Sequence, residues 1–293
     1  MANKGKYYES QFEKATIELL CEAHWQYAFG DDIHRKYTDP FIEEDLRNFL
    51  AAQYKDKNLT TSEMDSIVAN LRNTGGQNDY YALRNAFLLY RDGYDFAYSD
   101  GRYNPFRLEY IDFEHPDHNV FRCVNQFVME QGRENRRPDI LLFINGIPVC
   151  IIELKNPTKQ NATIRDAHTQ ICMRYMRDIP ALLKYCALAV ISDGAKNALG
   201  TTYTPFEFFY EWKKIENEDT AGKGLDTLRT LIRGALSPER ILEILRDYVY
   251  FPDPTKEDDT TEIVCRYPQF FATRKLRNHI LNHLRSVGGD GKG

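Results

Sequence analysis

Two short runs of strand-forming residues, PDILLFI and PVCIIELK, lie between residues 138 and 155 with an Asn-Gly pair between them. This arrangement predicts a β-hairpin with a tight turn. The otherwise apolar hairpin carries Asp139, Glu153 and Lys155. Charges on buried strands cost free energy unless they are paired or bind a ligand, so these three residues are the first candidates for a functional site.

The loop of the hairpin decides whether the two carboxylates meet. Because side chains alternate along a strand, a strict two-residue loop sets Asp139 opposite Ile152 and leaves the carboxylates on opposite faces. A three-residue loop with Gly146 in the left-handed conformation instead sets Asp139 across from Glu153. A joint function of the two acids therefore requires that longer loop or a bulge near Glu153.

Two facing carboxylates repel each other, and one of them stays protonated unless a cation lies beside them. Oxygen ligands of this kind suit Mg²⁺, which keeps several waters and leaves positions for a phosphate oxygen. The ammonium of Lys155 would lie next to such an ion, where it could orient or deprotonate a water or stabilise charge on a scissile phosphate. A lone Asp…Glu-x-Lys pattern is also typical of a surface hairpin with an ion pair, so the surrounding sequence has to decide.

Hydrophobic periodicity along the chain predicts a mixed α/β (α+β) fold, with a mixed sheet flanked by helices and a C-terminal helical segment. The polar stretch at 217–224 is the best candidate for a domain boundary. We expect Thr61 or Ser62, and later Ser237, to cap helices. The expected helices span 7–28, 43–54, 61–72, 80–90, 163–177, 225–236, 238–249 and 273–284, and the expected strands 106–113, 119–130, 138–144, 148–155, 186–192 and, with aromatic residues, 205–212.

Composition excludes several classes of protein. No apolar run approaches the roughly 18 residues that span a bilayer, so we expect no membrane association. The six cysteines form no CxxC pair, which predicts free thiols in a reducing cytoplasm rather than a cysteine zinc site. The net charge of −5 gives no overall attraction for DNA, so contacts with it must come from a local basic strip. Arg136 and Arg137, before the hairpin, and Lys159, after it, are the candidates.

The Pro-Asp pair and the Glu-Leu-Lys triplet of the hairpin resemble the PD-(D/E)xK nuclease motif. Together with RLEYIDF, NVFRCVNQFVME, DAHTQICMRYMRDIP and AVISDG, they make the chain similar to the N-terminal part of the restriction (R) subunit of type I restriction endonucleases. The resemblance extends from about Ser10 to Ala272. It implies a PD-(D/E)xK restriction-endonuclease-like fold and Mg²⁺-dependent cleavage of double-stranded DNA. In the full-length protein it implies ATP-driven translocation and control by modification (methyltransferase) and specificity subunits.

The resemblance also implies roles for single residues. Asp139 and Glu153 match the metal-binding acids, and Lys155 matches the catalytic lysine. The first helix of such nucleases commonly supplies another acid, for which Glu13 matches best and Glu9 and Glu18 compete.

The helix after the Glu-x-Lys triplet often carries a Gln…Tyr pair that helps to hold the DNA and the active site. Gln170 and Tyr175 are the candidates, but their spacing is five residues instead of the usual four. In an α-helix, Arg174 shares the face of Gln170 and Tyr175 does not. Either the helix is locally distorted or Arg174 takes the second role. Arg136 and Arg137 are implied as phosphate contacts.

Residues 265–280, CRYPQFFATRKLRNHI, resemble the adenine-recognising Q motif that precedes helicase-like motors. Gln269 would then bind the adenine of ATP, although Pro268 stands where the family often has His. The terminal GGDGKG matches a phosphate-binding loop poorly, so we expect the motor itself to be absent. The implied organisation is an endonuclease domain over 1–217 with a helical insertion at about 43–92. A helical linker toward the motor follows over 218–293, with the Q-motif-like segment at 266–275.

Two other interpretations remain open. A non-catalytic DNA-binding or assembly module of nuclease fold would have no reason to keep Asp139, Glu153 and Lys155 together on apolar strands. A stand-alone nuclease of the same fold would have no use for a Q-motif-like tail.

Overall fold

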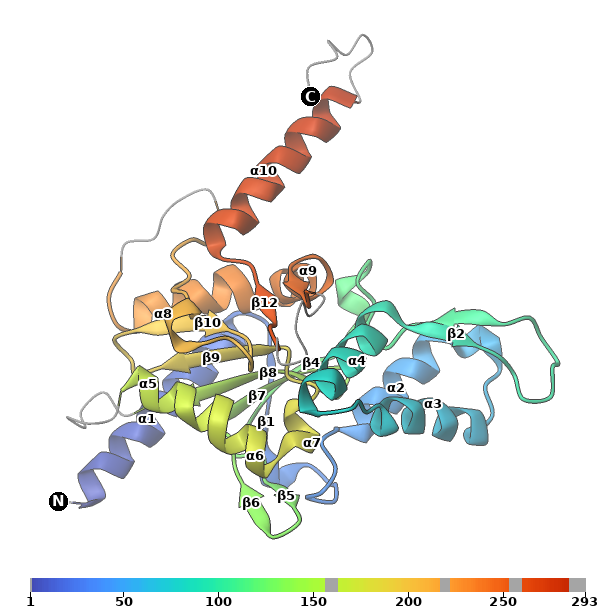
Figure 1. Ribbon diagram of the computed structural model, residues 1–293, viewed down its shortest axis with the longest axis horizontal. Coiled ribbons are helices and arrows are strands. Elements are labelled where there is room, and N and C mark those ends of the chain that lie inside the picture. Colours follow the sequence, from blue (N-terminus) through green and yellow to red (C-terminus); the bar gives the residue numbers. More distant parts are fainter. Residues whose placement is uncertain (1, 156–162, 217–221, 253–259, 285–293) are drawn as a thin grey trace.

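The computed structural model describes residues 2–155, 163–216, 222–252 and 260–284, with side chains described from residue 10 onward (Figure 1). Its centre is a six-stranded mixed sheet with the order β1-β4-β7-β8-β9-β10. β1 is parallel to β4 and β8 to β9, and the other neighbours are antiparallel. The strands are β1 (Gln26–Phe29), β4 (Phe121–Asn125), β7 (Ile140–Ile144), β8 (Ile147–Leu154), β9 (Leu188–Ser192) and β10 (Asn197–Gly200).

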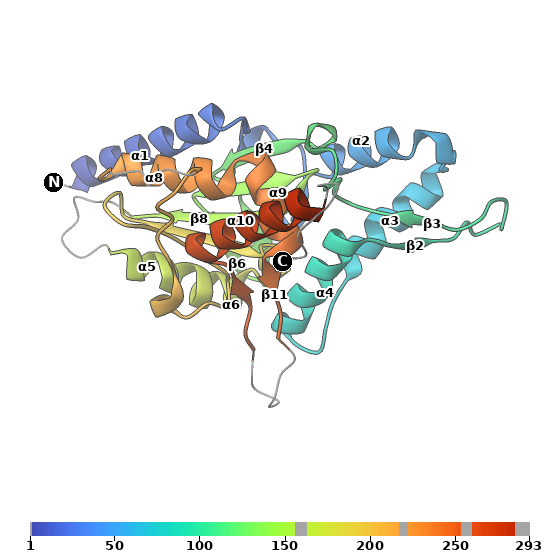
Figure 2. The same cartoon turned by 90° about the horizontal axis from the view of Figure 1, so that it is seen from above.

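Alternate residues of the central strands enter two separate cores. Along β7, Ile140, Leu142 and Ile144 pack on one side of the sheet, which we call the α1 face, and Leu141 and Phe143 pack on the other, the η4 face. Helices cover both faces, so the sheet is the middle layer of a sandwich (Figure 2). The α1 face is covered by α1 (Ala2–Glu22), α8 (Leu225–Leu231), the π-helical η6 (Ile232–Leu236) and α9 (Pro238–Asp247), and the η4 face by α5 (Ile164–Thr169), the π-helical η4 (Gln170–Tyr175), α6 (Met176–Asp178) and α7 (Pro180–Leu183).

A helical lobe lies beside the sheet and confirms the helices expected between residues 43 and 92 (Figure 1). It begins on the hairpin turn, where the backbone N–H of Ile42 donates to the carbonyl of Gly146 at 3.0 Å. The cap of its second helix is Thr60, one residue before the position expected, because Thr60 and Glu63 form a capping box. The lobe comprises α2 (Glu43–Gln53), η2 (Lys55–Lys57), α3 (Thr61–Asn73) and α4 (Asp79–Asp92), followed by the ribbon β2 (Tyr94–Phe96) and β3 (Phe106–Leu108).

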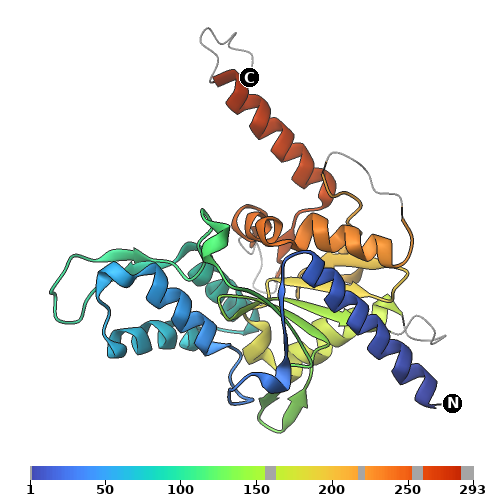
Figure 3. The same ribbon diagram turned by 180° about the vertical axis from the view of Figure 1, so that it is seen from behind.

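The helices after residue 222 pack into the hydrophobic core on the α1 face of the sheet. Leu228, Leu231 and Ile241 belong to the same buried cluster as the α1 face, and the indole N–H of Trp25 donates to the carbonyl of Leu236 at 2.7 Å. Ser237 is the N-cap residue of α9, as expected. The domain boundary that we expect at residue 217, between the first domain and the helical linker, stays a prediction. The chain continues through the paired strands β11 (Val249–Tyr250) and β12 (Ile263–Val264) into α10 (Tyr267–Leu284), which extends away from the body (Figure 3).

Several expected elements differ from the structure. The expected strand 106–113 is limited to β3, and the expected strand 119–130 is divided at Gln126, which has a positive φ of 55°, into β4 and β5 (Met129–Gln131) of another sheet. The first helix ends at Glu22 rather than 28, because His24 adopts a positive φ of 71° that a helix cannot continue, and residues 26–29 form β1. The aromatic segment 205–212 is not a strand: it contains the 3₁₀ turn η5 (Phe206–Phe208), and Tyr210 alone bridges Leu199 of β10. The last helix begins at residue 267 instead of 273.

None of the helices in the described ranges combines the length and apolar content that a membrane crossing requires. All six cysteines are free, as expected, and the reducing cytoplasm stays a prediction. Cys123, Cys150 and Cys186 are buried, whereas Cys21 is exposed.

Candidate active site

The turn of the β7–β8 hairpin is tight. Ile144 pairs with Ile147 across Asn145 and Gly146, whose φ values of 50° and 76° are those of a type I′ turn. Of the two alternatives, the three-residue loop is therefore wrong. The register instead shifts inside the hairpin, because Phe143 pairs with Pro148 and the preceding Leu142 with Cys150.

The extra residue in this ladder is Val149, which forms a β-bulge. Val149 and Cys150 both pack on the α1 face, although neighbouring residues of a regular strand point to opposite faces. A bulge fits here because Pro148 has no N–H to donate to the ladder. Beyond it, Ile151 packs on the η4 face, and Glu153, two residues on, points the same way. The required bulge is confirmed, though it lies nearer the turn than Glu153.

The bulge brings the two acids together. Ile140 pairs with Ile152, so the preceding Asp139 lies across from Glu153, and Asp139 Oδ2 accepts the backbone N–H of Leu154 at 2.7 Å. The Glu153 side chain is only 1% exposed. Burial, and secondly the negative charge of Asp139, raise the pKa of Glu153 well above its usual value, against the opposing effect of Lys155. The site is a buried carboxylate beside a second carboxylate, as the charges of the sequence suggested.

Lys155 is the cation of this site. Its Nζ lies 2.8 Å from Glu153 Oε1 and also donates to Gln170 Oε1 at 2.7 Å. The side chain is 15% exposed, so the ammonium stands between the buried acid and the solvent. The hairpin thus places the lysine against Glu153, which lies across from Asp139.

The π-helical turn η4 explains the unusual spacing of Gln170 and Tyr175. Five residues of α-helix turn about 500°, which places the two side chains on different faces. In a π-helix the hydrogen bonds join residues i and i+5, so both side chains face the sheet. Gln170 Nε2 donates to the Tyr175 hydroxyl at 2.6 Å, and that hydroxyl donates to Glu153 Oε2 at 3.3 Å. Of the two alternatives, the structure contains the distorted helix, and Arg174 is exposed.

Tyr175 closes a ring of hydrogen bonds with Glu153, Lys155 and Gln170. Burial, and secondly the charge of Glu153, raise the pKa of the Tyr175 hydroxyl, which therefore remains a proton donor. The ring fixes the orientation of the Glu153 carboxylate and of the ammonium group together.

Glu13 of α1 lies at the same end of the sheet as Asp139. Its carboxylate accepts from Asn125 Nδ2 at 2.5 Å and from Gln126 Nε2 at 2.9 Å, and the backbone N–H of Gln126 donates to the Asp139 carbonyl at 3.1 Å. Glu18 is exposed, and the side chain of Glu9 lies outside the described residues. Of the two acids whose side chains the structure describes, Glu13 is the one that this network connects to the backbone of Asp139.

Asn125 and Gln126 are residues of this site that sequence reasoning missed. The signal was a polar pair at the end of an apolar strand, NVFRCVNQ, in the same kind of place as the Glu-x-Lys triplet. A positive φ of 55° at Gln126 ends the strand there. Its side-chain amide donates to the carboxylate of Glu13, and its backbone N–H donates to the carbonyl of Asp139.

The predicted DNA contacts have different surroundings. The guanidinium of Arg136 donates to Asp178 at 2.7 Å and to Glu134 at 2.6 Å, which ties the hairpin of β5 (Met129–Gln131) and β6 (Glu134–Arg136) to α6. Arg137 is exposed. Lys159 lies outside the described residues. Contact of any of these side chains with DNA stays a prediction.

The predicted nucleotide contact, Gln269, caps α10 in this structure. Its Oε1 accepts the backbone N–H of Arg266 at 2.8 Å. Recognition of adenine by this residue stays a prediction, and the terminal GGDGKG lies outside the described residues.

A second Glu-x-Lys triplet shows what distinguishes the first. Glu211 and Lys213 form a similar ion pair of 3.2 Å, but their side chains are 49% and 58% exposed. The pair in the hairpin is instead 15% and 1% exposed, and its Glu153 lies across from Asp139. The triplet of the hairpin is therefore distinguished by its burial and by the nearby Asp139, and not by its spacing.

A mixed six-stranded sheet between two helical layers is consistent with a nuclease-like α/β fold. The protein-family model described as type I restriction enzyme R protein N terminus matches residues 6–208 of this sequence. The chain belongs to this family. It is 27% identical to the type I restriction enzyme HindI endonuclease subunit of Haemophilus influenzae over 91% of this chain and 26% of that one. It is 26% identical to the type I restriction enzyme SsaAORF53P endonuclease subunit of Staphylococcus saprophyticus, over 80% of this chain and 23% of that one. The chain thus spans about a quarter of the length of these relatives.

Proposed function

We propose that this chain is the Mg²⁺-dependent endonuclease domain of a type I restriction enzyme R subunit, and that it hydrolyses phosphodiesters of double-stranded DNA at a site of the PD-(D/E)xK type. The observation that carries the proposal is the shared face of Asp139 and Glu153, created by the bulge at Val149, with Lys155 bonded to one of the two acids. Membership of the family supports the proposal independently. The free thiols agree with a cytoplasmic enzyme.

The residues of the site fit a magnesium ion. The donors that face each other are carboxylate oxygens, which Mg²⁺ prefers over nitrogen or sulfur. Burial, and secondly the charge of Asp139, raise the pKa of Glu153, so a cation between the two acids would stabilise their ionised forms. Asp139 and Glu153 would hold the ion, with Glu13 as a third acid nearby. When bound, the ion would activate a water molecule and neutralise charge on the phosphate.

The side chains around these acids have separate tasks in this proposal. Lys155 places a positive charge beside the reacting phosphate and orients the attacking water through its ammonium. Gln170 and Tyr175 hold the lysine and Glu153 in place, since each donates or accepts within the same ring. Arg137, with an exposed side chain, and Lys159 would bind phosphates of the DNA backbone. Arg136 would share that task only after partial release from Asp178 and Glu134.

In the full-length protein we propose that cleavage is coupled to ATP-driven DNA translocation and to partner modification and specificity subunits. Gln269 would then contact the adenine of ATP. Residues 225–251, which pack against the sheet, and α10 would connect the nuclease to the motor. Sequence specificity would reside in the partner subunits.

Replacement of Asp139 by Ala in the full-length protein, assembled with its partners, tests the proposal. We expect DNA cleavage to fall at least about 100-fold, because the remaining acid cannot hold the metal alone. ATP hydrolysis should continue at the rate of the unaltered enzyme. A non-catalytic assembly module predicts a different result, in which cleavage by the complex is unchanged by the substitution.

A further inference from the structure

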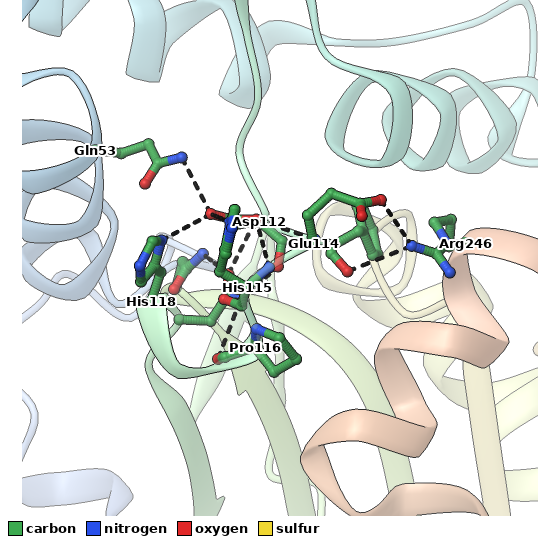
Figure 4. Close-up of polar contacts among 10 residues, drawn as sticks. Gln53, Asp112, Glu114, His115, Pro116, His118 and Arg246 are labelled. Atoms are coloured by element: carbon green, nitrogen blue, oxygen red, sulfur yellow. Dashed lines mark hydrogen bonds and ion pairs between the residues drawn. The ribbon is translucent and has the colours of Figure 1, made fainter.

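The loop between β3 and β4 brings one carboxylate and two imidazoles together (Figure 4). Asp112 Oδ2 lies 2.9 Å from His118 Nδ1 and 3.3 Å from His115 Nδ1. The possible ligand atoms of the three residues all lie within 4.8 Å of one another. The two rings stack on each other with centroids 4.8 Å apart and an angle of 23° between their planes.

Local structure produces this convergence. Asp112, His115 and His118 are spaced three residues apart, and His118 ends the 3₁₀ turn η3 (Pro116–His118), in which side chains at i and i+3 eclipse. Asp112 Oδ1 accepts the backbone N–H groups of Glu114 and His115 at 3.0 and 2.9 Å, which leaves Oδ2 facing the imidazoles. The Asp112 side chain is 6% exposed, whereas His115 and His118 are 63% and 49% exposed. The carboxylate is therefore fixed in position and the two rings are accessible from solvent.

We propose that this loop binds a divalent transition-metal ion of the Zn²⁺ class through Asp112 Oδ2 and the Nδ1 atoms of His115 and His118, with water as a further ligand. Ligands about 2.0–2.1 Å from a tetrahedral ion are about 3.3 Å from one another, close to the separations between Asp112 and each histidine. Two imidazole nitrogens and one carboxylate favour zinc and its neighbours over magnesium. The chemistry of this site therefore differs from that of the pair Asp139 and Glu153.

The loop lies where three parts of the molecule meet. Gln53 of α2 donates to Asp112 Oδ2 at 3.2 Å, which leaves the other lone pair of that oxygen for an ion. Arg246 of α9 pairs with Glu114 at 3.0 Å, as Figure 4 shows. Asn119 accepts from the backbone N–H of Asp112 at 2.9 Å and from the Asn145 side chain at 2.8 Å. An ion held by the loop would stiffen the junction of the helical lobe, α9 and the hairpin turn.

This role is structural rather than catalytic. The loop contacts Asn145 at one end of β7, and Asp139 precedes the other end, roughly 20 Å away for a strand of this length. The ion would therefore stabilise the turn that sets the hairpin without reaching the DNA-cleaving groups.

Zinc binding by this 293-residue chain, measured by titration calorimetry in excess Mg²⁺, tests the proposal. His279 and His283 of α10 lie one turn apart and form a second possible chelating pair, so both are replaced by Ala in every protein used. We expect one Zn²⁺ per chain, a higher Tm with zinc, and visible absorption when Co²⁺ is added. His115→Ala and His118→Ala should each weaken binding about tenfold or more.

Glu114→Ala is the matched control, because this exposed acid lies in the same loop and pairs with Arg246 instead of facing the imidazoles. It should bind zinc like the parent. The histidine side chains are largely exposed, so their variants should keep the circular dichroism spectrum of the parent. The proposal is overturned if the double variant His115→Ala, His118→Ala binds zinc as tightly as the parent, or if the parent binds it only with a Kd of about 1 mM or weaker.

Discussion

Lys155→Ala in the assembled full-length enzyme should reduce DNA cleavage about 100-fold to 10,000-fold while ATP hydrolysis continues. The ammonium is the cation bonded to the buried Glu153 at 2.8 Å, and its removal takes away the charge that we propose lies beside the reacting phosphate. Folding should survive the change, because Glu153 can keep a proton when its partner is lost and its pKa is already raised. Single-turnover cleavage of a plasmid substrate, with the ATPase rate measured on the same sample, gives both quantities.

Lys213→Ala is the matched control for this prediction. It removes the lysine of the other Glu-x-Lys triplet, which has an ion pair of 3.2 Å on the surface. Exposed pairs of this kind contribute about 0–1 kcal/mol to stability, and this one lies outside the network of Asp139. Cleavage should be unchanged in Lys213→Ala. Equal activity of the two lysine variants would contradict the assignment of Lys155.

Gly146→Ala should lower the free energy of unfolding by about 3 kcal/mol or more, a fall in Tm of roughly 6–12 °C. Gly146 has a φ of 76°, and a Cβ there would lie 2.1 Å from the carbonyl oxygen of Ile42. That carbonyl precedes α2, and the N–H of Ile42 is bonded to Gly146, so the helical lobe cannot move away without losing a hydrogen bond. Thermal unfolding followed by circular dichroism measures the effect.

Gly132→Ala separates the clash from the backbone conformation. Gly132 lies in the turn between β5 and β6 with a φ of 61°, and an added Cβ would meet no described atom within 4 Å. Its substitution should cost only about 1 kcal/mol, the penalty for a left-handed residue with a side chain. If the two glycine variants unfold at the same temperature, the close packing of the lobe on the hairpin turn is contradicted.

The hairpin and its charges could be predicted from sequence because turn chemistry and strand propensity are local. The position of the bulge could not, since Val149 and Cys150 are both apolar and either could have paired regularly. Tertiary packing decided it: both side chains fill the α1 face, and Pro148 leaves a gap in the ladder. The bulge determines which face of the sheet Glu153 occupies. The local sequence therefore did not determine whether Glu153 lies on the same face as Asp139.

The sequence left the distorted helix at Gln170–Tyr175 as one of two alternatives, and it did not predict β1, for a related reason. The spacing of Gln170 and Tyr175 is inconsistent with an α-helix, and only their bonds to Glu153 and Lys155 explain why the helix widens there. The apolar pattern of the first helix continued into β1, and the break at His24 depends on a backbone conformation that its residue type does not require. Local patterns gave the fold class, and long-range contacts placed the polar groups of the site.

Manganese binding to the 293-residue chain, followed by the loss of the free-ion electron paramagnetic resonance signal, tests the central claim most directly. The His118→Ala background keeps the Asp112 loop from contributing. We predict one bound Mn²⁺ per chain, weakened about tenfold or more by Asp139→Asn and by Glu153→Gln alike, because both carboxylates hold the same ion. Binding should also weaken as the pH falls, since the raised pKa of Glu153 lets protons compete at a higher pH than for an ordinary carboxylate. Unchanged manganese binding in both variants would show that the bulged hairpin does not form a metal site.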